Sequence, residues 1–232
     1  MNLLAPFTAL HDLLALGGPV VMLLAAMSVL SLAVILTKLA QFAREGVGRH
    51  TGLETAVSLW DNGQRSQAIV AAGTANTHLG PVLSKSMMTF AQTQGGMALR
   101  ARVEGEMAER LDLLERGFRL LDSIAQTAPL LGLFGTVLGM IDAFQALQLA
   151  GASVDPSVLA GGIWVALLTT AAGLGVAMPT ALALTWLETR AGADRAMADT
   201  MIRRLFCPVS DDETSSDLIR AAGKSHGFSG LV

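Results

Sequence analysis

The hydrophobic and polar positions of this chain are separated into long blocks. Residues 13–37, 123–141 and 156–187 contain no Asp, Glu, Lys or Arg. A transmembrane helix needs about 20 predominantly apolar residues to cross about 30 Å of hydrocarbon. We therefore predict an all-α membrane protein with three spanning helices, at residues 19–37, 123–147 and 157–187. The third uncharged block would form about 48 Å of helix, so it must tilt or continue beyond the bilayer inside protein.

The basic residues predict the side of the membrane on which each connection lies. Of the 16 Lys and Arg residues, ten lie between the first and second spans and six follow the third. The N-terminal arm at 1–18 and the loop at 148–156 contain none. Because positively charged loops stay in the cytoplasm, we predict a periplasmic N-terminus and a cytoplasmic C-terminus.

The cytoplasmic segment at 38–122 has the pattern of a helical domain. The sequences GLETAVSLW and QRSQAIVAAG flank the turn DNG at 61–63, which predicts a helical hairpin. In the stretch 98–123, apolar residues recur every three or four positions, as on one face of a helix. They are Leu99, Val103, Met107, Leu111, Leu114, Phe118 and Leu121. We expect this helix to run without a break into the second span and to bury its apolar face against a neighbour.

The opposite face of that helix carries acidic residues four positions before basic ones, a spacing that favours ion pairs along a helix. We interpret these charges as a solvated face and not as a site. The pairs are Glu106–Arg110, Asp112–Arg116 and Glu115–Arg119.

The remaining segments are simpler. The arm at 1–18 is interpreted as an amphipathic helix at the periplasmic membrane surface, with a disordered leader as the alternative. Residues 188–207 are predicted to be a cytoplasmic helical extension of the third span. The polar tail at 208–232 is predicted to be largely disordered.

Composition excludes several function classes. The chain is 52% hydrophobic and only 15% charged, and its mean hydropathy is +0.51, which argues against a soluble protein. The net charge of −3 provides no basic surface for nucleic acid. Its single cysteine, Cys207, excludes a disulfide framework within the chain. No GxSxG or HExxH motif is present and the four histidines are far apart, so we expect no enzyme, metal or cofactor.

The second and third spans are rich in small residues, prolines and hydroxyls. Small residues let helix backbones approach closely in lipid, where no hydrophobic force drives helices together. Those assigned to helix packing are Gly132, Gly135, Gly139, Gly161, Gly162 and Gly173, with Ala128, Ala143, Ala166, Ala177 and Ala181 in the same rows. Pro129 and Pro179 leave backbone carbonyls without their helical donors, which produces at least a kink.

The hydroxyls have two interpretations. A threonine in a membrane helix often bonds its own backbone carbonyl. Alternatively, threonines beside small-residue rows line a polar path or receive a polar group from a partner helix. The candidates for such a path are Thr136, Thr170, Thr169 and Thr127. Because the span cores contain no ionisable residue, we expect any proton-carrying carboxylate to come from another chain.

Two motifs resemble the ExbB/TolQ/MotA family of proton channels. TAPLLGLFGTVLGMIDAF at 127–144 is similar to the family's second-span motif. GGIWVALLTTAAGLGVAMPTALAL at 161–184 is similar to the third-span motif of ExbB and TolQ. The three predicted spans also match ExbB and TolQ, whereas MotA has four.

The resemblance implies a motor subunit of the bacterial inner membrane that uses the proton motive force. It implies a homopentamer whose second and third spans enclose a pore, and a partner of the ExbD or TolR type whose membrane aspartate carries the proton. The family's pore threonines correspond to Thr136 and Thr170. The energy would reach TonB or TolA and drive outer-membrane transport.

One position departs from the family pattern. Where ExbB and TolQ often have Glu in GIAEAL, this chain has Val165 in GIWVAL. A mechanism that needs this carboxylate in the channel subunit therefore does not fit this chain. Other interpretations are a TolQ-like role in outer-membrane integrity and division, a passive channel or transporter subunit, and a membrane enzyme. Since no inverted repeat is evident, a self-contained transporter is disfavoured.

Overall fold

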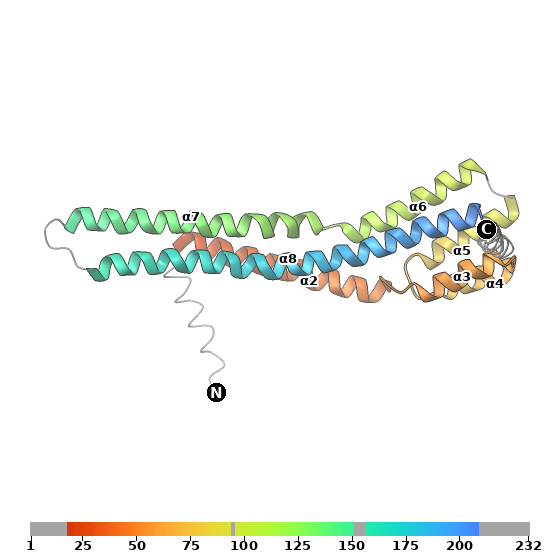
Figure 1. The fold of residues 1–232 in the computed structure, drawn as a ribbon, viewed down its shortest axis with the longest axis horizontal. Helices are drawn as coiled ribbons and strands as arrows, with labels where there is room; N and C mark the ends of the chain where they lie inside the picture. Colours follow the sequence, from red (N-terminus) through yellow and green to blue (C-terminus); the bar gives the residue numbers. More distant parts are fainter. Residues whose placement is uncertain (1–17, 94–95, 151–155, 209–232) are drawn as a thin grey trace, which may run out of the picture. The chain divides into compact units, whose positions relative to one another are not determined.

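The computed structural model describes residues 18–93, 96–150 and 156–208, and this part of the chain folds as helices joined by short turns (Figure 1). The predicted N-terminal arm and the predicted disordered tail fall almost entirely outside these residues. In chain order, the helices are α2 (Gly18–Glu45), α3 (Thr51–Asp61), α4 (Arg65–Thr74), α5 (Gly80–Thr93), α6 (Met97–Glu115), α7 (Phe118–Ala150) and α8 (Pro156–Phe206). The described residues contain no strand.

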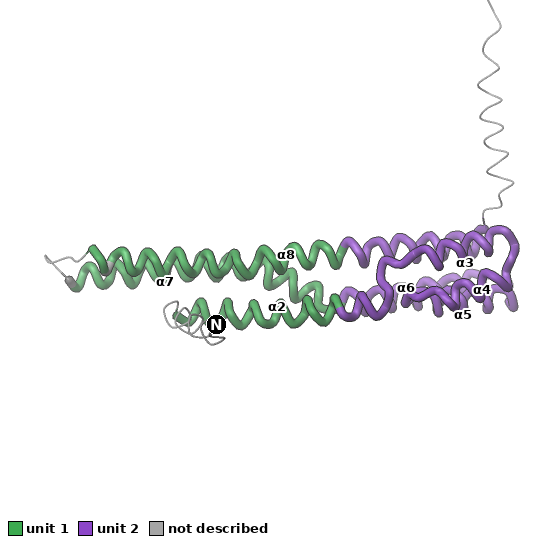
Figure 2. Tube along the Cα trace, turned by 90° about the horizontal axis from the view of Figure 1, so that it is seen from below, with its two compact units in different colours: residues 1–39, 116–188 green, residues 40–115, 189–232 purple. Residues whose placement is uncertain are grey.

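The chain forms two compact units (Figure 2). Unit 1 comprises residues 1–39 and 116–188, and unit 2 comprises residues 40–115 and 189–232. The predicted membrane-length helices are confirmed, because three helical segments carry an apolar window long enough to cross a bilayer. These segments are Gly18–Glu45, Met97–Leu149 and Leu159–Phe206.

In unit 1, α2 packs on α7 and α8. Val20 and Leu24 of α2 are buried together with Ala128 of α7 and Ala177 of α8. The two alanines allow this contact because they add little bulk to their helices. The outward faces of the same helices expose large apolar side chains that require lipid or other helices as neighbours. Examples are Leu30, Leu133, Phe134, Trp164 and Leu182.

The uninterrupted helix predicted from residue 98 into the second span is divided at Gly117. α6 ends at Glu115 and α7 begins at Phe118. Gly117 has a φ of 94°, a left-handed conformation that glycine adopts without the steric cost of a side chain. Because the apolar residues keep their helical spacing across this turn, the sequence pattern did not reveal the break.

Unit 2 contains the predicted hairpin, formed by α3 and α4. Its turn is closed by the backbone N–H of Gly63, which donates to the carbonyl of Trp60 at 3.1 Å. The Trp60 side chain is buried, and its Nε1 donates to the carbonyl of Leu205 at 3.3 Å. The ring of Phe90 packs edge-on between those of Trp60 and Phe206, with centroids 5.6 and 5.5 Å away.

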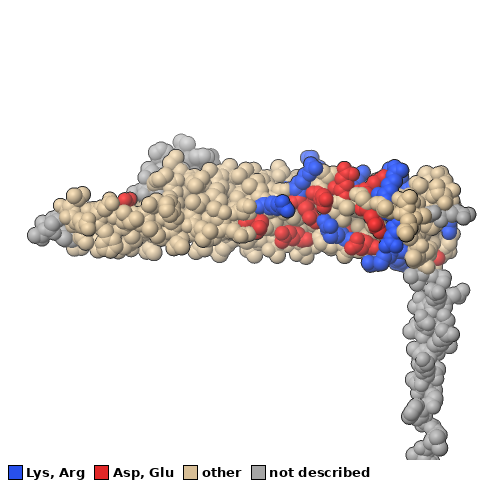
Figure 3. Space-filling view, turned by 90° about the horizontal axis from the view of Figure 1, so that it is seen from above, with Lys and Arg blue, Asp and Glu red and all other residues tan. Residues whose placement is uncertain are grey.

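The predicted apolar face of α6 is confirmed, since Val103, Met107, Leu111 and Leu114 are buried. The predicted ion pairs along that helix are replaced by others. Glu106 pairs with Arg102 and with Lys85 of α5, whereas Arg195 of α8 pairs with Asp112 and Glu115. Exposed charges on α6 thus pair both along α6 and with neighbouring helices. Figure 3 shows basic and acidic side chains interleaved on one face, without a large area of single sign.

Candidate functional site

The candidate site is the contact between α7 and α8 in unit 1, where small residues bring the two helices close together. The helices run in opposite directions along this contact, and Figures 1 and 2 show them side by side. The facing groups, from one end to the other, are Ala128 with Gly173, Gly132 with Thr169, Thr170 and Gly173, Gly135 with Thr169, Gly139 with Ala166, and Ala143 with Gly162.

Two of these glycines are required by the closeness of the backbones. A Cβ atom on Gly132 would lie 2.9 Å from the carbonyl oxygen of Thr169. A Cβ atom on Gly173 would lie 2.6 Å from the carbonyl oxygen of Ala128. Because the obstructing atoms belong to the backbone, no side-chain rotation relieves these clashes. Any larger residue would therefore separate the helices.

The sequence assigned six glycines to helix packing, and five of them lie in this contact. Around Gly161, by contrast, a Cβ atom would meet nothing within 4 Å. The sequence also assigned Pro129 and Pro179 to the site, and both lie inside continuous helices, α7 and α8. Since proline has no N–H, each leaves the carbonyl four residues earlier without its usual donor.

The hydroxyl of Thr169 lies inside the contact. The residue is 2% exposed, and its Oγ1 donates to the carbonyl of Ala166 at 2.7 Å, with the carbonyl of Gly132 on α7 at 3.3 Å. The adjacent Thr170 is half-buried, and its Oγ1 lies 3.4 Å from the same Gly132 carbonyl. Two hydroxyls from α8 therefore meet a single backbone oxygen of α7.

That backbone oxygen also connects the site to Thr136. In an α-helix, the carbonyl of residue 132 accepts the N–H of residue 136. The Thr136 hydroxyl donates to the carbonyl of Leu133 at 2.6 Å, and the residue is half-buried. The hydroxyls of Thr169 and Thr170 contact the Gly132 carbonyl, whereas Thr136 is joined to it only through its backbone N–H. We call these three residues the threonine cluster. The fourth candidate, Thr127, is exposed on α7, and the hydroxyls at the Gly132 carbonyl are those of Thr169 and Thr170 instead.

Among the described residues, the stretches of α7 and α8 that contain the threonine cluster, 123–141 and 156–187, have no charged side chain. Val165, at the position where the family often has Glu, is half-buried on α8. Its neighbours Trp164 and Leu167 are 65% and 62% exposed. The polar groups that this region offers are therefore hydroxyls and helix carbonyls, which form hydrogen bonds without imposing a fixed charge.

The sequence of these two helices and of the residues that flank them matches a known protein family. A model of the MotA/TolQ/ExbB proton channel family matches residues 74–199, more than half of the chain. The chain belongs to this family. The ExbB/TolQ resemblance of the two span motifs is thereby confirmed, and the three apolar helices make the chain a multi-pass membrane protein.

Individual relatives have names of the same kind. The chain is 41% identical over 120 residues to "Biopolymer transport protein exbB1" of Vibrio cholerae, covering 51% of this chain and 52% of that protein. It is 30% identical over 177 residues to a putative ExbB homolog of Methanothermobacter thermautotrophicus, covering 74% of this chain and 60% of that protein. It is 38% identical over 87 residues to the Tol-Pal system protein TolQ of Haemophilus influenzae, covering 38% of each chain. The matched segments thus span between about two fifths and three fifths of these curated relatives.

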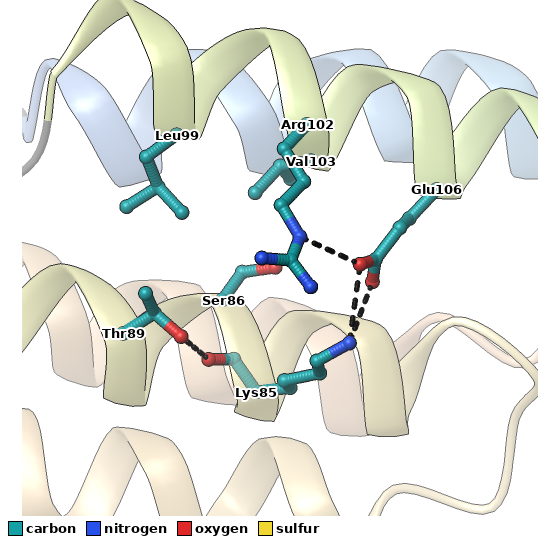
Figure 4. Close-up of a pocket in the computed structure, with 7 residues that line it drawn as sticks. All are labelled: Lys85, Ser86, Thr89, Leu99, Arg102, Val103 and Glu106. Atoms are coloured by element: carbon teal, nitrogen blue, oxygen red, sulfur yellow. Dashed lines mark hydrogen bonds and ion pairs between the residues drawn. The ribbon is translucent and has the colours of Figure 1, made fainter.

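Unit 2 has a small cleft between α5 and α6, shown in Figure 4. Its volume is about 50 Å³, far below the about 300–1,000 Å³ of a typical ligand pocket. Lys85 and Arg102 hold the Glu106 carboxylate at its edge, with Nζ and Nε at 3.1 and 3.2 Å from Oε1. The hydrogen bond from Lys85 makes the largest contribution to lowering the pKa of Glu106, and the bond from Arg102 acts in the same direction. We interpret the cleft as an ion-paired helix contact and not as a binding site.

Proposed function

We propose that this chain is an ExbB-type channel subunit of the bacterial inner membrane, which conducts protons together with a single-span partner. The observation that carries the proposal is the threonine cluster around the Gly132 carbonyl, on helices that contain the two family motifs. Membership of a proton channel family supports the same conclusion. The chain would act as a transport subunit and not as an enzyme.

The proposed assembly is a homopentamer with a periplasmic N-terminus and a cytoplasmic C-terminus, in which α7 and α8 of each copy face a central pore. The apolar side chains exposed on unit 1 support an assembly within lipid, since one chain leaves them uncovered. The pore would hold the membrane helix of an ExbD- or TolR-type partner. A carboxylate on that partner would carry the proton, because the described spanning stretches at 123–141 and 156–187 contain no Asp or Glu.

The chemistry of the wall fits a group that changes its charge. A purely apolar wall would penalise a bare carboxylate by several kcal/mol or more. A hydroxyl donates to the ionised carboxylate and accepts from the protonated acid, so it serves both states. We propose that Thr136 and Thr170 line this wall and contact the partner's carboxyl group, whereas Thr169 holds α7 and α8 together. Thr127 belongs to the proposed path only as its cytoplasmic end.

Val165 is consistent with a wall in which this chain provides hydroxyls and the partner provides the carboxylate. A carboxylate at this position would add a fixed negative charge near the partner's acid and disfavour its ionised form. With valine, the charged group comes from the partner alone. The resulting partner movement would be transmitted to TonB and energise outer-membrane transport.

Purification of the chain with its membrane partners tests this function. We expect native mass spectrometry to find five copies with a single-span protein that has an aspartate in its span, and proteoliposomes to conduct protons only when that partner is present. A monomer that binds no such protein would contradict the proposal. Conduction by the chain alone would instead support a passive channel. Loss of outer-membrane integrity, without loss of energy-dependent uptake, in a deletion strain would indicate the TolQ-like role.

A further inference from the structure

A buried carboxylate in unit 2 joins three segments of the chain. Asp194, on α8, is 0% exposed. Its Oδ1 accepts hydrogen bonds from the backbone N–H of Gly48 and from Nε2 of His50, each at 2.8 Å. Its Oδ2 lies 3.5 Å from Nδ1 of His78. We call Asp194, His50 and His78 the histidine–aspartate cluster.

Local sequence positions the first of these segments. Gly48 has a φ of 80°, so the turn that presents its N–H to Asp194 favours glycine. His50 is the N-cap residue of α3 but makes no capping hydrogen bond with its side chain. Ser, Thr, Asp or Asn usually occupies an N-cap. A histidine at this position is explained by its bond to Asp194.

His78 is the most deeply buried ring of the cluster. Its side chain is 3% exposed, and its backbone N–H donates to the carbonyl of Glu45 at 2.9 Å. Neither ring nitrogen has a hydrogen-bond partner among the described residues. Protonation would bury a positive charge on this ring, and the facing acceptor, Oδ2 of Asp194, lies 3.5 Å from Nδ1, longer than a well-formed hydrogen bond.

The charges around His78 act in both directions. Burial is the largest influence and lowers the pKa of His78 below 6.5, although the carboxylates of Asp194 and Glu45 act to raise it. The Arg110 guanidinium of α6 also lowers the pKa of His78, in the same direction as burial. On α8, Arg190 also lies near this region, because a Cβ atom on Gly48 would be 2.8 Å from its Nη1.

We propose that the histidine–aspartate cluster is a pH-sensitive clamp, which holds residues 46–50 and 75–79 against α8 when His78 is neutral and releases them when His78 binds a proton. The His50 side chain is 24% exposed and its Nε2 lies 2.8 Å from Oδ1 of Asp194. The His78 side chain is only 3% exposed and lies farther from that carboxylate, at 3.5 Å. Its protonation favours an open arrangement in which water solvates the ring.

The direction of the pH effect follows from linkage. In the unfolded or open segment, His78 titrates near its ordinary pKa of about 6.5, whereas in the closed clamp its pKa is lower. The closed form therefore binds fewer protons in the interval between the two values. Its stability is complete above about pH 6.5 and falls as the pH decreases toward the lower pKa.

This proposal concerns unit 2 and stands independently of the channel. If the channel function is correct, a clamp that opens in acid would make the cytoplasmic part of the subunit respond to protons that the assembly admits. The test uses no proton flux, so failure of the clamp and failure of the channel are distinguishable.

Hydrogen–deuterium exchange of the full chain in detergent at pH 7.5 and 5.8 tests the clamp. After correction for intrinsic exchange rates, we expect amides at 46–50 and 75–79 to exchange at least about threefold faster at the lower pH. The His78→Phe variant should lose this dependence, because phenylalanine fills the site without titrating. Glu106→Gln, a titratable position elsewhere in unit 2, should retain it.

Equal corrected exchange at the two pH values would overturn the proposal, as would an unchanged pH dependence in His78→Phe. Should that variant fail to fold, exchange of the ring C2 hydrogens in the unaltered chain, followed by mass spectrometry, gives the pKa of each histidine. We expect a pKa below 6.5 for His78. A value at or above 6.5 would refute the clamp.

Discussion

The hydroxyl oxygen of Thr170, on α8, lies 3.4 Å from the carbonyl oxygen of Gly132, on α7. The same carbonyl is the helical acceptor for the N–H of Thr136. The two threonines proposed for the pore wall are therefore linked through one polar atom. This arrangement depends on the glycines that allow α7 and α8 to approach, so a change that separates these helices should disturb it even if both threonines remain.

Gly135→Ala tests the need for close helix packing. The new Cβ would lie 2.7 Å from Cβ and Oγ1 of Thr169, and this Cβ cannot move without shifting α8. We expect a loss of about 1–3 kcal/mol in stability, seen as a lower melting temperature in detergent, together with reduced proton conduction. Gly175→Ala is the matched control, because nothing lies within 4 Å of its Cβ position in the chain. Equal melting temperatures for the two variants would contradict the packing account.

Two Gly→Ala substitutions, one at the break between α6 and α7 and one within α6, should change the stability of the protein in opposite directions. Gly117→Ala forces a side chain into a backbone with a φ of 94°, at a cost of about 1–3 kcal/mol. Gly105→Ala lies in α6 with open space around it and should stabilise the helix by about 0.5–1 kcal/mol. Thermal unfolding of both variants measures the difference. Stabilisation by Gly117→Ala would mean that the helix is continuous there.

Glu106→Gln tests the interpretation of the cleft between α5 and α6. The lowered pKa of Glu106 means that its hydrogen bonds to Lys85 and Arg102 stabilise the fold above its ordinary pKa, and that this contribution is lost as the pH falls through the lower value. Because the group is near the surface, the variant should lose no more than about 1 kcal/mol at pH 7. In acid the two proteins should have the same melting temperature. A strong loss of conduction without a loss of stability would indicate a site instead.

The elements with a strong local signal were predictable from the sequence. Uncharged blocks located the three apolar helices, and DNG located the turn between α3 and α4. The signal for the break at Gly117 was a lone glycine within a helical pattern, and such a glycine is usually tolerated. Ion-pair partners were not predictable because Lys85 and Arg195 come from other helices.

The candidate site was predictable in composition but not in its arrangement. Small-residue rows identified the α7–α8 contact, but only the structure distinguishes buried Thr169 from half-buried Thr170 and places Gly161 outside the contact. The histidine–aspartate cluster had no signal in the sequence. His50 and Asp194 are separated by 144 positions, and only the fold reveals that Asp194 is buried.

The most direct test of the channel account is proton flux in proteoliposomes that contain the chain and its single-span partner, with Thr170→Val compared to Thr170→Ser. Valine retains the shape but removes the hydroxyl, which contributes only about 0.6 kcal/mol in a typical membrane helix contact, so the assembly should persist. We predict that partner-dependent flux falls at least about tenfold in the valine variant, equivalent to about 1.4 kcal/mol, and is largely retained with serine. Unchanged flux in Thr170→Val, and likewise in Thr136→Val, would contradict the claim that these hydroxyls serve the proton path.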